Sequence, residues 1–282
     1  MMTSAMSSHG KTAIICMGGG MRSAYSAGFL YALATKLKLA PDIIIGTSGN
    51  AGNVLYYAAG QYESAKRVWC NLIATRKFIS PWRVWKILDI DYLIDTIFKK
   101  QEPLNVEALA TTSVEWYVPI TDAESGETRY VSAEDHADPF ELLRAAKATP
   151  FFFGKKVSLF GRMFIDGEVG PTLEDHVAFV TKKDADRILI INNGSDHSRV
   201  MDFLKRLYAE LEPSPLREKM LHDMPGDHMC ATGPEGTKII CIFPGPLPAR
   251  FSTVDKKALA ATLELGEQKA IALEQELRTL LS

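Results

Sequence analysis

The N-terminal part of the chain contains the same short pattern twice, and this pattern restricts the fold more than any other feature. An apolar run over residues 12–17 is followed by the glycine-rich turn 18–23 and a helical pattern from Ala24 onward. A second apolar run, residues 43–45, is followed by a turn around Gly46 and another helix. Each unit predicts a buried strand, a tight turn and a helix. Two such units in succession predict parallel strands in an α/β sheet.

The remaining segments extend this α/β pattern along the chain. Apolar or alternating runs predict further strands, and segments of helical periodicity predict helices. The predicted strands cover residues 116–121, 128–132, 157–165, 187–192 and 238–243, and the main predicted helices cover 53–72, 138–148, 202–211 and 256–281. Since there is no internal repeat or low-complexity linker, we expect one domain over residues 1–282, with a core over about 12–244. The amphipathic helix 256–281 is predicted to pack on this domain or on a partner chain.

Composition and charge exclude several classes of function. With 282 residues, 46% hydrophobic and 23% charged, the chain has the composition of an ordinary globular protein with a sizeable core. A net charge of −2 gives no bulk attraction to nucleic acid or to an anionic membrane. No stretch is apolar for long enough to span a bilayer, and the N-terminus lacks the pattern of a secretory signal. We therefore expect a cytoplasmic protein that binds no nucleic acid.

The cysteine and histidine pattern predicts neither a metal site nor a cofactor. The four cysteines are dispersed, which suits a reducing compartment. They are Cys16, Cys70, Cys230 and Cys241. Cys16 and Cys241 lie in apolar runs, where a thiol acts as a small hydrophobe. A loose group of metal-ligating residue types is formed by His222, Asp223, His228 and Cys230. Because this group lacks a CxxC or HxxxH spacing, we interpret it as a loop.

Ser48 stands at the second of the two turns. The run Gly46-Thr47-Ser48-Gly49-Asn50 has the first glycine of the nucleophile elbow G-x-S-x-G, with Asn50 in place of the last. An elbow of this kind lifts a serine hydroxyl above the sheet. Taken alone, the same run is explained as well by Ser48 being a helix N-cap.

The first turn carries three consecutive glycines, residues 18–20. Backbone N–H groups in such a loop suit an anion, which leaves three interpretations open. The loop is an oxyanion hole, a weak match to a dinucleotide-binding turn, or a tight turn with no ligand. A Walker loop is excluded, because no Gly-Lys-Ser/Thr follows.

A serine nucleophile needs a proton acceptor within hydrogen-bond reach. None of the six histidines follows an apolar strand and precedes a turn, whereas Asp166 does, because residues 163–165 lead into Asp166-Gly167. The carboxylate is therefore expected at a strand end, where sites in open sheets form. Asp-Gly is also common in ordinary turns.

Three of these motifs together resemble those of patatin-like phospholipases. They are GGGMR at 18–22, GTSGN at 46–50 and IDGEVG at 165–170, in the family's order. The segment RAAKATPFF at 144–152 and the strand pair over 121–132 also resemble family segments, so the resemblance covers about residues 12–244. It implies a three-layer αβα fold with a mainly parallel central sheet.

The resemblance also implies roles for particular residues. Ser48 would be the nucleophile and Asp166 its proton acceptor, in a dyad without histidine that hydrolyses a lipid or acyl ester. Backbone N–H groups in the loop would hold the oxyanion. The loop residues are Gly18, Gly19, Gly20 and Met21. Arg22 matches a basic position of the family and would position the loop or bind an anionic substrate. Neither a metal nor a cofactor is implied.

Three residues depart from the family pattern. Ser23 and Asn50 replace glycines of the oxyanion loop and the elbow, and Glu168 adds a carboxylate after Asp166-Gly167. Ser23 and Asn50 motivate a second hypothesis, a non-catalytic relative that binds lipid or acyl ligands. Nucleotide binding at residues 18–20 is the third hypothesis.

The segment 78–100 is unusually rich in tryptophan and isoleucine. Two interpretations remain open. The segment is a lipid-facing lid that makes transient contact with a membrane surface, or a set of helices packed over the sheet.

Overall fold

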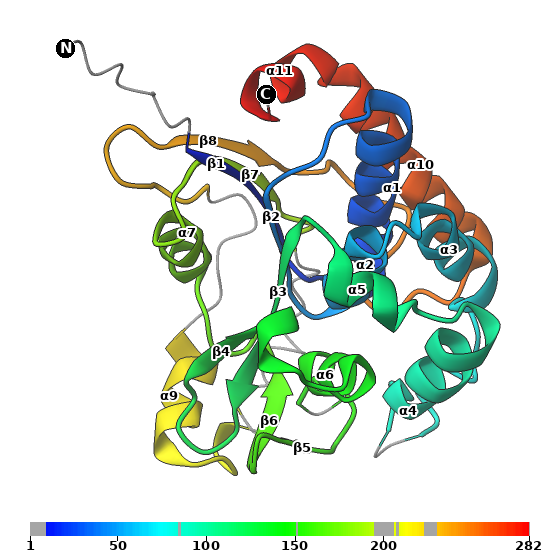
Figure 1. Ribbon diagram of the computed structural model, residues 1–282. Helices are drawn as coiled ribbons and strands as arrows, with labels where there is room; N and C mark the ends of the chain where they lie inside the picture. Colours follow the sequence, from blue (N-terminus) through cyan, green and yellow to red (C-terminus); the bar gives the residue numbers. More distant parts are fainter. Residues whose placement is uncertain are drawn as a thin grey trace.

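A computed structural model describes residues 10–83, 86–150, 152–194, 206, 209–222 and 230–281. An eight-stranded sheet runs through the centre of the molecule, in the order β5-β6-β3-β2-β1-β7-β8, with β4 paired to β3 outside this path (Figure 1). The strands are β1 Lys11–Cys16, β2 Ile43–Gly46, β3 Glu115–Asp122, β4 Thr128–Val131, β5 Val157–Leu159, β6 Arg162–Asp166, β7 Ala185–Ile191 and β8 Lys238–Ile242.

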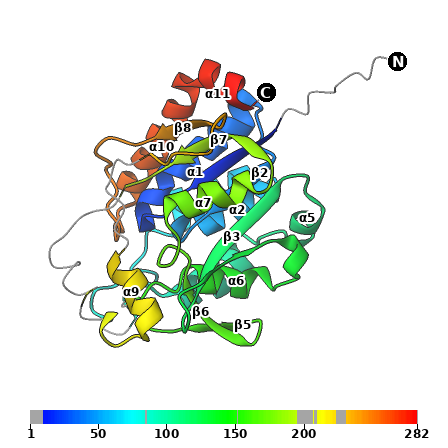
Figure 2. The same ribbon diagram turned by 90° about the vertical axis from the view of Figure 1, so that its left-hand side faces the viewer.

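Helices cover both faces of this sheet and make the fold a three-layer α/β structure. In Figure 1, α1, α2, α6 and α10 lie on one side of the sheet, and α7 lies on the other. Figure 2 shows α7 in front of the strands. The helices are α1 Ala24–Ala32, α2 Gly49–Ala58, α3 Tyr62–Arg67, α4 Ile90–Tyr92, α5 Val106–Thr111, α6 Pro139–Ala146, α7 Leu173–Thr181, α9 Ser214–His222, α10 Lys256–Ala272 and α11 Glu274–Leu281. The predicted fold class is confirmed.

The register of the central strands determines where a site forms. β1 pairs in parallel with both β2 and β7, and its last residue, Cys16, lies opposite Gly46 of β2. Both glycine-containing turns therefore start at the same edge of the sheet. β6 pairs antiparallel to β3 and ends at Asp166, which lies opposite Ile120. Three segments that are remote in the sequence thus meet near the carboxyl ends of β1 and β2.

Side chains from alternate positions of β1 and β2 fill two separate apolar layers. Ile15 and Ile43 pack with Val177 of α7, whereas Ile14 and Ile44 belong to the larger cluster on the opposite face, with α1 and α2. All four isoleucines are completely buried. Burial on both faces explains why these strands read as continuous apolar runs rather than alternating ones.

The C-terminal segment packs on the chain's own fold. It forms two helices separated at Leu273 instead of the one predicted over 256–281, and α10 crosses α1. At the crossing the backbones approach so closely that a Cβ at Gly28 would lie 1.9 Å from the Leu263 carbonyl oxygen. A Cβ at Gly266 would lie 2.0 Å from the Tyr25 carbonyl oxygen.

Two other expectations are corrected. The helix predicted over 53–72 is interrupted after Ala58, and α3 starts only at Tyr62, because the chain turns at Gly60 with φ +69°. Cys241 is bonded to Cys230, whereas it was expected to be a small free hydrophobe. Cys16 is buried and free, as expected, and Cys70 is also free.

Some predictions fall mainly outside the described residues. This applies to most of the helix predicted over 202–211, and to Asp223 and His228 of the loose cluster. Within the described part, no group of three or more His, Cys, Asp and Glu side chains is placed to hold a metal ion. Across the same described part, none of the helices combines the length and apolar character needed to cross a membrane. A cytoplasmic location stays a prediction.

Candidate active site

Ser48 lies in a sharp turn between β2 and α2. Its backbone adopts φ 48° and ψ −114°, a region that L-residues rarely populate and that costs about 1–3 kcal/mol. The turn is too crowded for a side chain at the glycines on either side of Ser48. A Cβ at Gly46 would lie 2.5 Å from a Val54 methyl group. A Cβ at Gly49 would lie 2.7 Å from the Gly20 carbonyl oxygen. Ser48 makes no side-chain cap hydrogen bond to α2, so its hydroxyl is available for other partners.

The Ser48 hydroxyl donates a hydrogen bond to Asp166. The distance from Ser48 Oγ to Asp166 Oδ2 is 2.8 Å. Thr149 Oγ1 donates to the same oxygen at 2.5 Å, and the Glu168 backbone N–H donates to Oδ1 at 3.0 Å. Asp166 is only 1% exposed. Gly167 is needed beside it, because a Cβ there would lie 1.9 Å from the Pro119 carbonyl oxygen.

Opposing influences act on the Asp166 carboxyl group. Burial raises its pKa above the ordinary value, because the charged form loses its hydration. Hydrogen bonds from Thr149, the Glu168 N–H and Ser48 favour the carboxylate, as does the positive charge of Lys147, but the net direction is upward. A carboxylate with a raised pKa is a stronger base than an exposed one.

The glycine-rich loop adopts a conformation that only glycine takes easily. Gly19 has φ +126° and Gly20 has φ +58°. In the described part of the chain, the N–H groups of Gly19 and Gly20 have no protein acceptor. The Met21 N–H differs, because it donates to the Phe251 carbonyl oxygen at 3.0 Å. Gly20 and Met21 border the same cavity as Ser48.

Arg22 faces the protein and holds the loop in place. Its Nε and one terminal nitrogen donate to the Asn193 carbonyl oxygen at 2.8 and 2.6 Å. The Asn193 side chain donates to the carbonyl oxygens of Met17 and Gly18 at 2.7 and 3.0 Å. Of the two roles expected for Arg22, these contacts favour positioning the loop over binding an anionic substrate.

Asn50, which replaces the last glycine of the elbow, connects the elbow to the glycine-rich loop. Its Nδ2 donates to the Met17 carbonyl oxygen at 2.6 Å, and its Oδ1 accepts from Asn53 at 2.7 Å. Asn53 in turn accepts from the Trp69 indole N–H at 2.6 Å. Since Asn50 is completely buried and its amide is satisfied on both sides, the asparagine fits the elbow without an unpaired group.

Ser23, the second departure, is also completely buried. Its Oγ has no hydrogen-bond partner among the described residues and would lie 2.5 Å from a Cβ at Gly49. Serine at this position is therefore accommodated by glycine at position 49.

Glu168, the third departure, is exposed. Its carboxylate lies where a Cβ at Gly18 would stand.

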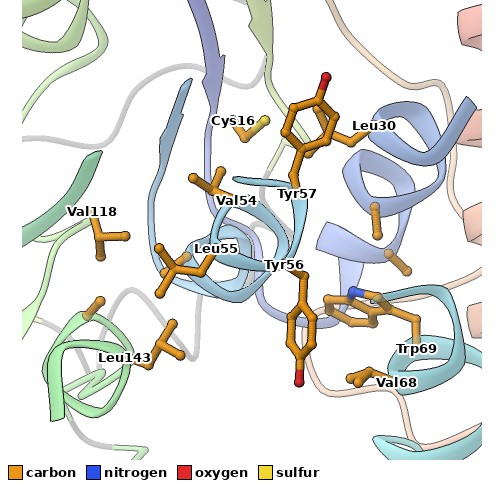
Figure 3. Close-up of a cluster of buried hydrophobic side chains, with 14 of the residues drawn as sticks. Cys16, Leu30, Val54, Leu55, Tyr56, Tyr57, Val68, Trp69, Val118 and Leu143 are labelled. Atoms are coloured by element: carbon orange, nitrogen blue, oxygen red, sulfur yellow. The ribbon is translucent and has the colours of Figure 1, made fainter. Parts of the chain in front are cut away.

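An apolar cavity opens beside Ser48. Its wall combines α2 with the segment that follows α3, and in Figure 3 Tyr56, Val68 and Trp69 gather on the same side of α2. Much of the opposite wall comes from the predicted tryptophan-rich segment. The lining residues from that segment are Phe78, Ile79, Leu88, Ile90, Leu93 and Phe98. These side chains are buried, so the packed interpretation is right for them, although they cover a cavity. Only Ile90, Leu93 and Phe98 lie in helices, whereas Ile79 and Leu88 form an isolated bridge.

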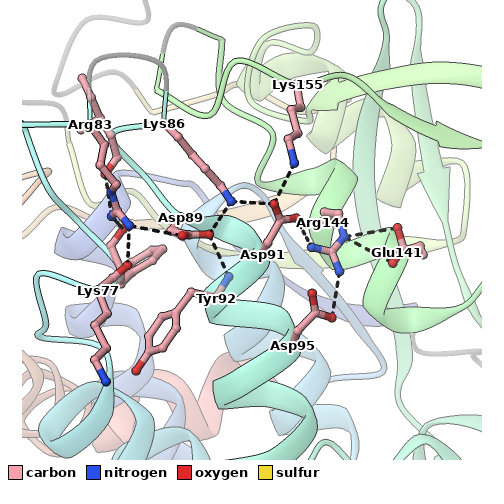
Figure 4. A network of polar contacts seen from close by, with 12 residues as sticks. Lys77, Arg83, Lys86, Asp89, Asp91, Tyr92, Asp95, Glu141, Arg144 and Lys155 are labelled. Atoms are coloured by element: carbon pink, nitrogen blue, oxygen red, sulfur yellow. Dashed lines mark hydrogen bonds and ion pairs between the residues drawn. The ribbon is translucent and has the colours of Figure 1, made fainter.

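Ion pairs hold this wall against the rest of the fold. Figure 4 shows the network in which Asp91 binds Lys86, Lys155 and Arg144. Arg144 belongs to α6 and also binds Asp95, 3.1 Å away. The network ties residues 86–95 to α6, and α6 precedes the segment that contacts Asp166.

Trp82 faces solvent, unlike the cavity-lining residues of the same tryptophan-rich segment. It is 86% exposed, the highest value among the large hydrophobic side chains described. Arg83 fixes the turn from which it projects, by donating to the carbonyl oxygens of Lys77 and Phe78 at 2.8 Å each. Trp85 lies outside the described residues.

Three residues of the site were missed by the sequence analysis. Thr149 and Lys147 belong to the segment RAAKATPFF, which attracted notice only as a resemblance. A polar residue among small and apolar ones shortly before a strand–Asp unit is the signal that points to them. Asn193 follows a buried strand and gives the same kind of signal.

Comparisons with known proteins agree with this fold. A family model for patatin-like phospholipases matches residues 14–173, more than half of the chain. The uncharacterized protein YjjU of Escherichia coli (strain K12) is 26% identical over 179 residues, covering 58% of this chain and 47% of that protein. The chain thus spans about half the length of this relative. The crystal structure of VipD from Legionella pneumophila has a TM-score of 0.53 at 11% identity, covering 95% of this chain and 67% of that chain.

The chain belongs to the patatin-like phospholipase family. The family match includes the glycine-rich loop, Ser48 and Asp166. The likeness to VipD, at 11% identity, is evidence of the fold alone.

Proposed function

We propose that the protein is a serine acyl hydrolase that cleaves carboxylic esters of lipids with Ser48 as nucleophile and Asp166 as base. The observation that carries this proposal is the 2.8 Å hydrogen bond from Ser48 Oγ to Asp166, beside an apolar cavity. Nucleophile and base are within reach of each other, and the base is oriented by Thr149 and the Glu168 N–H. Membership of the patatin-like phospholipase family supports an ester of a lipid as substrate.

The reaction follows from this geometry. Ser48 Oγ bonds to the ester carbonyl carbon while its proton passes to Asp166 Oδ2, and the carbonyl electron pair moves onto oxygen. When that pair returns, the bond to the leaving alcohol breaks and the alcohol takes the proton from Asp166. Water then attacks the acyl carbon and gives a proton to Asp166, and Ser48 leaves with that proton.

The oxyanion formed in each half-reaction needs donors that are already in place. The N–H groups of Gly19 and Gly20 are the proposed donors, because they have no other acceptor in the described part of the chain. The α2 helix begins at Gly49, directly after Ser48, and the partial positive charge of its N-terminus also favours an anion here. The Met21 N–H is left out of this proposal because Phe251 occupies it.

Trp82 supports transient contact with a membrane surface. Its indole is almost fully exposed, and it projects from the segment whose neighbours Phe78 and Ile79 line the cavity. Arg76 and Lys77 are exposed nearby and make no ion pair with a described residue. Tryptophan beside unpaired cations suits the interface of a lipid bilayer with anionic head groups.

A fluorophosphonate probe tests the catalytic assignment, because it reacts with activated serines whatever the natural substrate. We expect labelling of the wild type and of Ser158→Ala, an exposed serine on β5, and no labelling of Ser48→Ala. Asp166→Asn should keep the melting temperature near that of the wild type and slow labelling by at least about 100-fold. Equal labelling of wild type and Ser48→Ala would refute the nucleophile.

Different experimental results would favour each of the two alternative hypotheses. A folded protein that binds fatty acid but is never labelled at Ser48 would be the non-catalytic relative. Thermal stabilisation by ATP or NAD would favour nucleotide binding at residues 18–20. Two contacts weigh against the nucleotide, because the Glu168 carboxylate lies against Gly18 and the Phe251 ring against Gly20.

A further inference from the structure

Lys147 places a buried ammonium group beside the proposed dyad. It follows the last residue of α6 and is 6% exposed. Its Nζ donates to the carbonyl oxygens of Ser48 at 2.7 Å and Gly49 at 3.1 Å, and it borders the cavity. These bonds use two of its three protons and brace the turn that carries the nucleophile.

The charge of Lys147 has no close anionic partner. Within the described residues, no carboxylate lies within 4.0 Å of Nζ. A buried cation bonded only to neutral carbonyl groups is costly, and a fold that keeps it there gains from a charge at longer range. Asp166 is that charge, since the two groups act on each other electrostatically.

The other charged groups near this pair are directed elsewhere. Arg22, in the glycine-rich loop, binds the Asn193 carbonyl. Glu168, after β6, is exposed and lies against Gly18. Lys147 therefore provides the main positive charge that acts on the Asp166 carboxylate.

We propose that Lys147 is a positioning residue that braces the Ser48 turn and holds Asp166 in its charged form, ready to accept a proton. The proposal rests on the dyad of the proposed function. In this role Lys147 keeps its own protons throughout the reaction, and it donates to the backbone carbonyl oxygens of Ser48 and Gly49 rather than to the Ser48 hydroxyl.

The Lys147 charge acts on the Asp166 pKa in a known direction. Burial raises the Asp166 pKa, and the Lys147 charge opposes this rise. Removing the charge should raise that pKa further, so that Asp166 becomes protonated at a higher pH than in the wild type. Burial lowers the Lys147 pKa to about 8, so the ammonium group keeps its charge below that pH.

The test measures the rate of fluorophosphonate labelling of Ser48 against pH. In Lys147→Met we expect the acidic midpoint of the profile to rise by about one pH unit. Lys147→Arg, which keeps the charge, should retain the wild-type midpoint even if labelling is slower. Lys182→Met serves as the matched control, because Lys182 is exposed at the C-terminal end of α7 and does not border the cavity.

An unchanged midpoint in Lys147→Met would overturn the proposal. If that variant does not fold, Lys147→Gln, which keeps hydrogen-bond donors but no charge, takes its place with the same expectation. A second readout follows the Asp166 carboxyl group directly, by infrared or carbon NMR titration of isotope-labelled aspartate, with Asp166→Asn to assign the signal. A raised Asp166 pKa in Lys147→Gln supports the proposal even if Ser48 is never labelled, and an unchanged one refutes it independently of catalysis.

Discussion

Asn50 shows how a single residue can depart from a family pattern and still suit the site. Glycine is expected at this position of an elbow because the strand and helix backbones crowd each other there. In this chain the crowding falls on Gly46 and Gly49 instead. The Asn50 side chain joins the Met17 carbonyl of the glycine-rich loop to Asn53 of α2. The residue that departs from the elbow pattern therefore links the elbow to the glycine-rich loop.

Asn50→Gly, which restores the family pattern, should therefore weaken the protein. It removes three buried hydrogen bonds, to Met17, Ser26 and Asn53, and places glycine in a helix. Together these changes should lower the free energy of unfolding by about 2–3 kcal/mol. Fluorophosphonate labelling of Ser48 should slow by about 10-fold or more, because the loop loses its tie to the elbow. Chemical denaturation and labelling rates measure both effects. Wild-type stability together with faster labelling would contradict this account of Asn50.

At the scale of elements, the position of the glycine-rich loop depends on α1 and on the helix that crosses it. The loop leads directly into α1, and α1 is held by α10 through the close approach at Gly28 and Gly266. The C-terminal helix is thus part of the support for the site. On the other side of the cavity, Arg144 of α6 fixes the wall through Asp91 and Asp95 (Figure 4).

Gly266→Ala tests the helix crossing. Helix propensity alone predicts that this change stabilises an α-helix by about 1 kcal/mol. We expect a loss of about 1–3 kcal/mol instead, because the added methyl group would meet the Tyr25 carbonyl oxygen at 2.0 Å. Gln268→Ala, an exposed position on the same helix, should change stability by less than about 0.5 kcal/mol. A stabilised Gly266→Ala variant would show that the helices do not cross this closely.

At the scale of the whole molecule, the apolar cavity and the exposed Trp82 belong to one segment. Residues 78–79 and several residues of 88–98 line the cavity beside Ser48, and the turn at Trp82 faces solvent. This arrangement suits the proposed hydrolase, because the proposed lipid-surface contact at Trp82 and the cavity wall belong to one segment.

Trp82→Ala should separate surface binding from chemistry. We expect weaker sedimentation with vesicles of mixed zwitterionic and anionic phospholipid, by about 10-fold in partition coefficient, because a large interfacial side chain is lost. Hydrolysis of a soluble short-chain p-nitrophenyl ester should be unchanged. Leu265→Ala, an exposed apolar position on α10, serves as the control. Equal vesicle binding of the wild type and Trp82→Ala would remove Trp82 from the contact.

The sequence by itself determined the α/β class, the parallel central strands and the positions of the glycine-rich loop, Ser48 and Asp166. These features are local, because periodicity and turn residues depend on neighbours in the chain. The three-layer arrangement was implied by resemblance and then observed. Only the tertiary structure decided which groups face the site. Ser48 and Asp166 are 118 positions apart, and Arg22 and Asn193 are 171 positions apart.

The same reason explains what the sequence analysis missed. Lys147 and Thr149 read as ordinary residues of a helix end, and only the packing of that end against β6 turns Thr149 toward Asp166. The Met21 N–H was expected at the oxyanion hole, but Phe251, 230 positions away, accepts its hydrogen bond. Which donor stays free for a ligand depends on contacts between distant segments, and those form only when the chain packs.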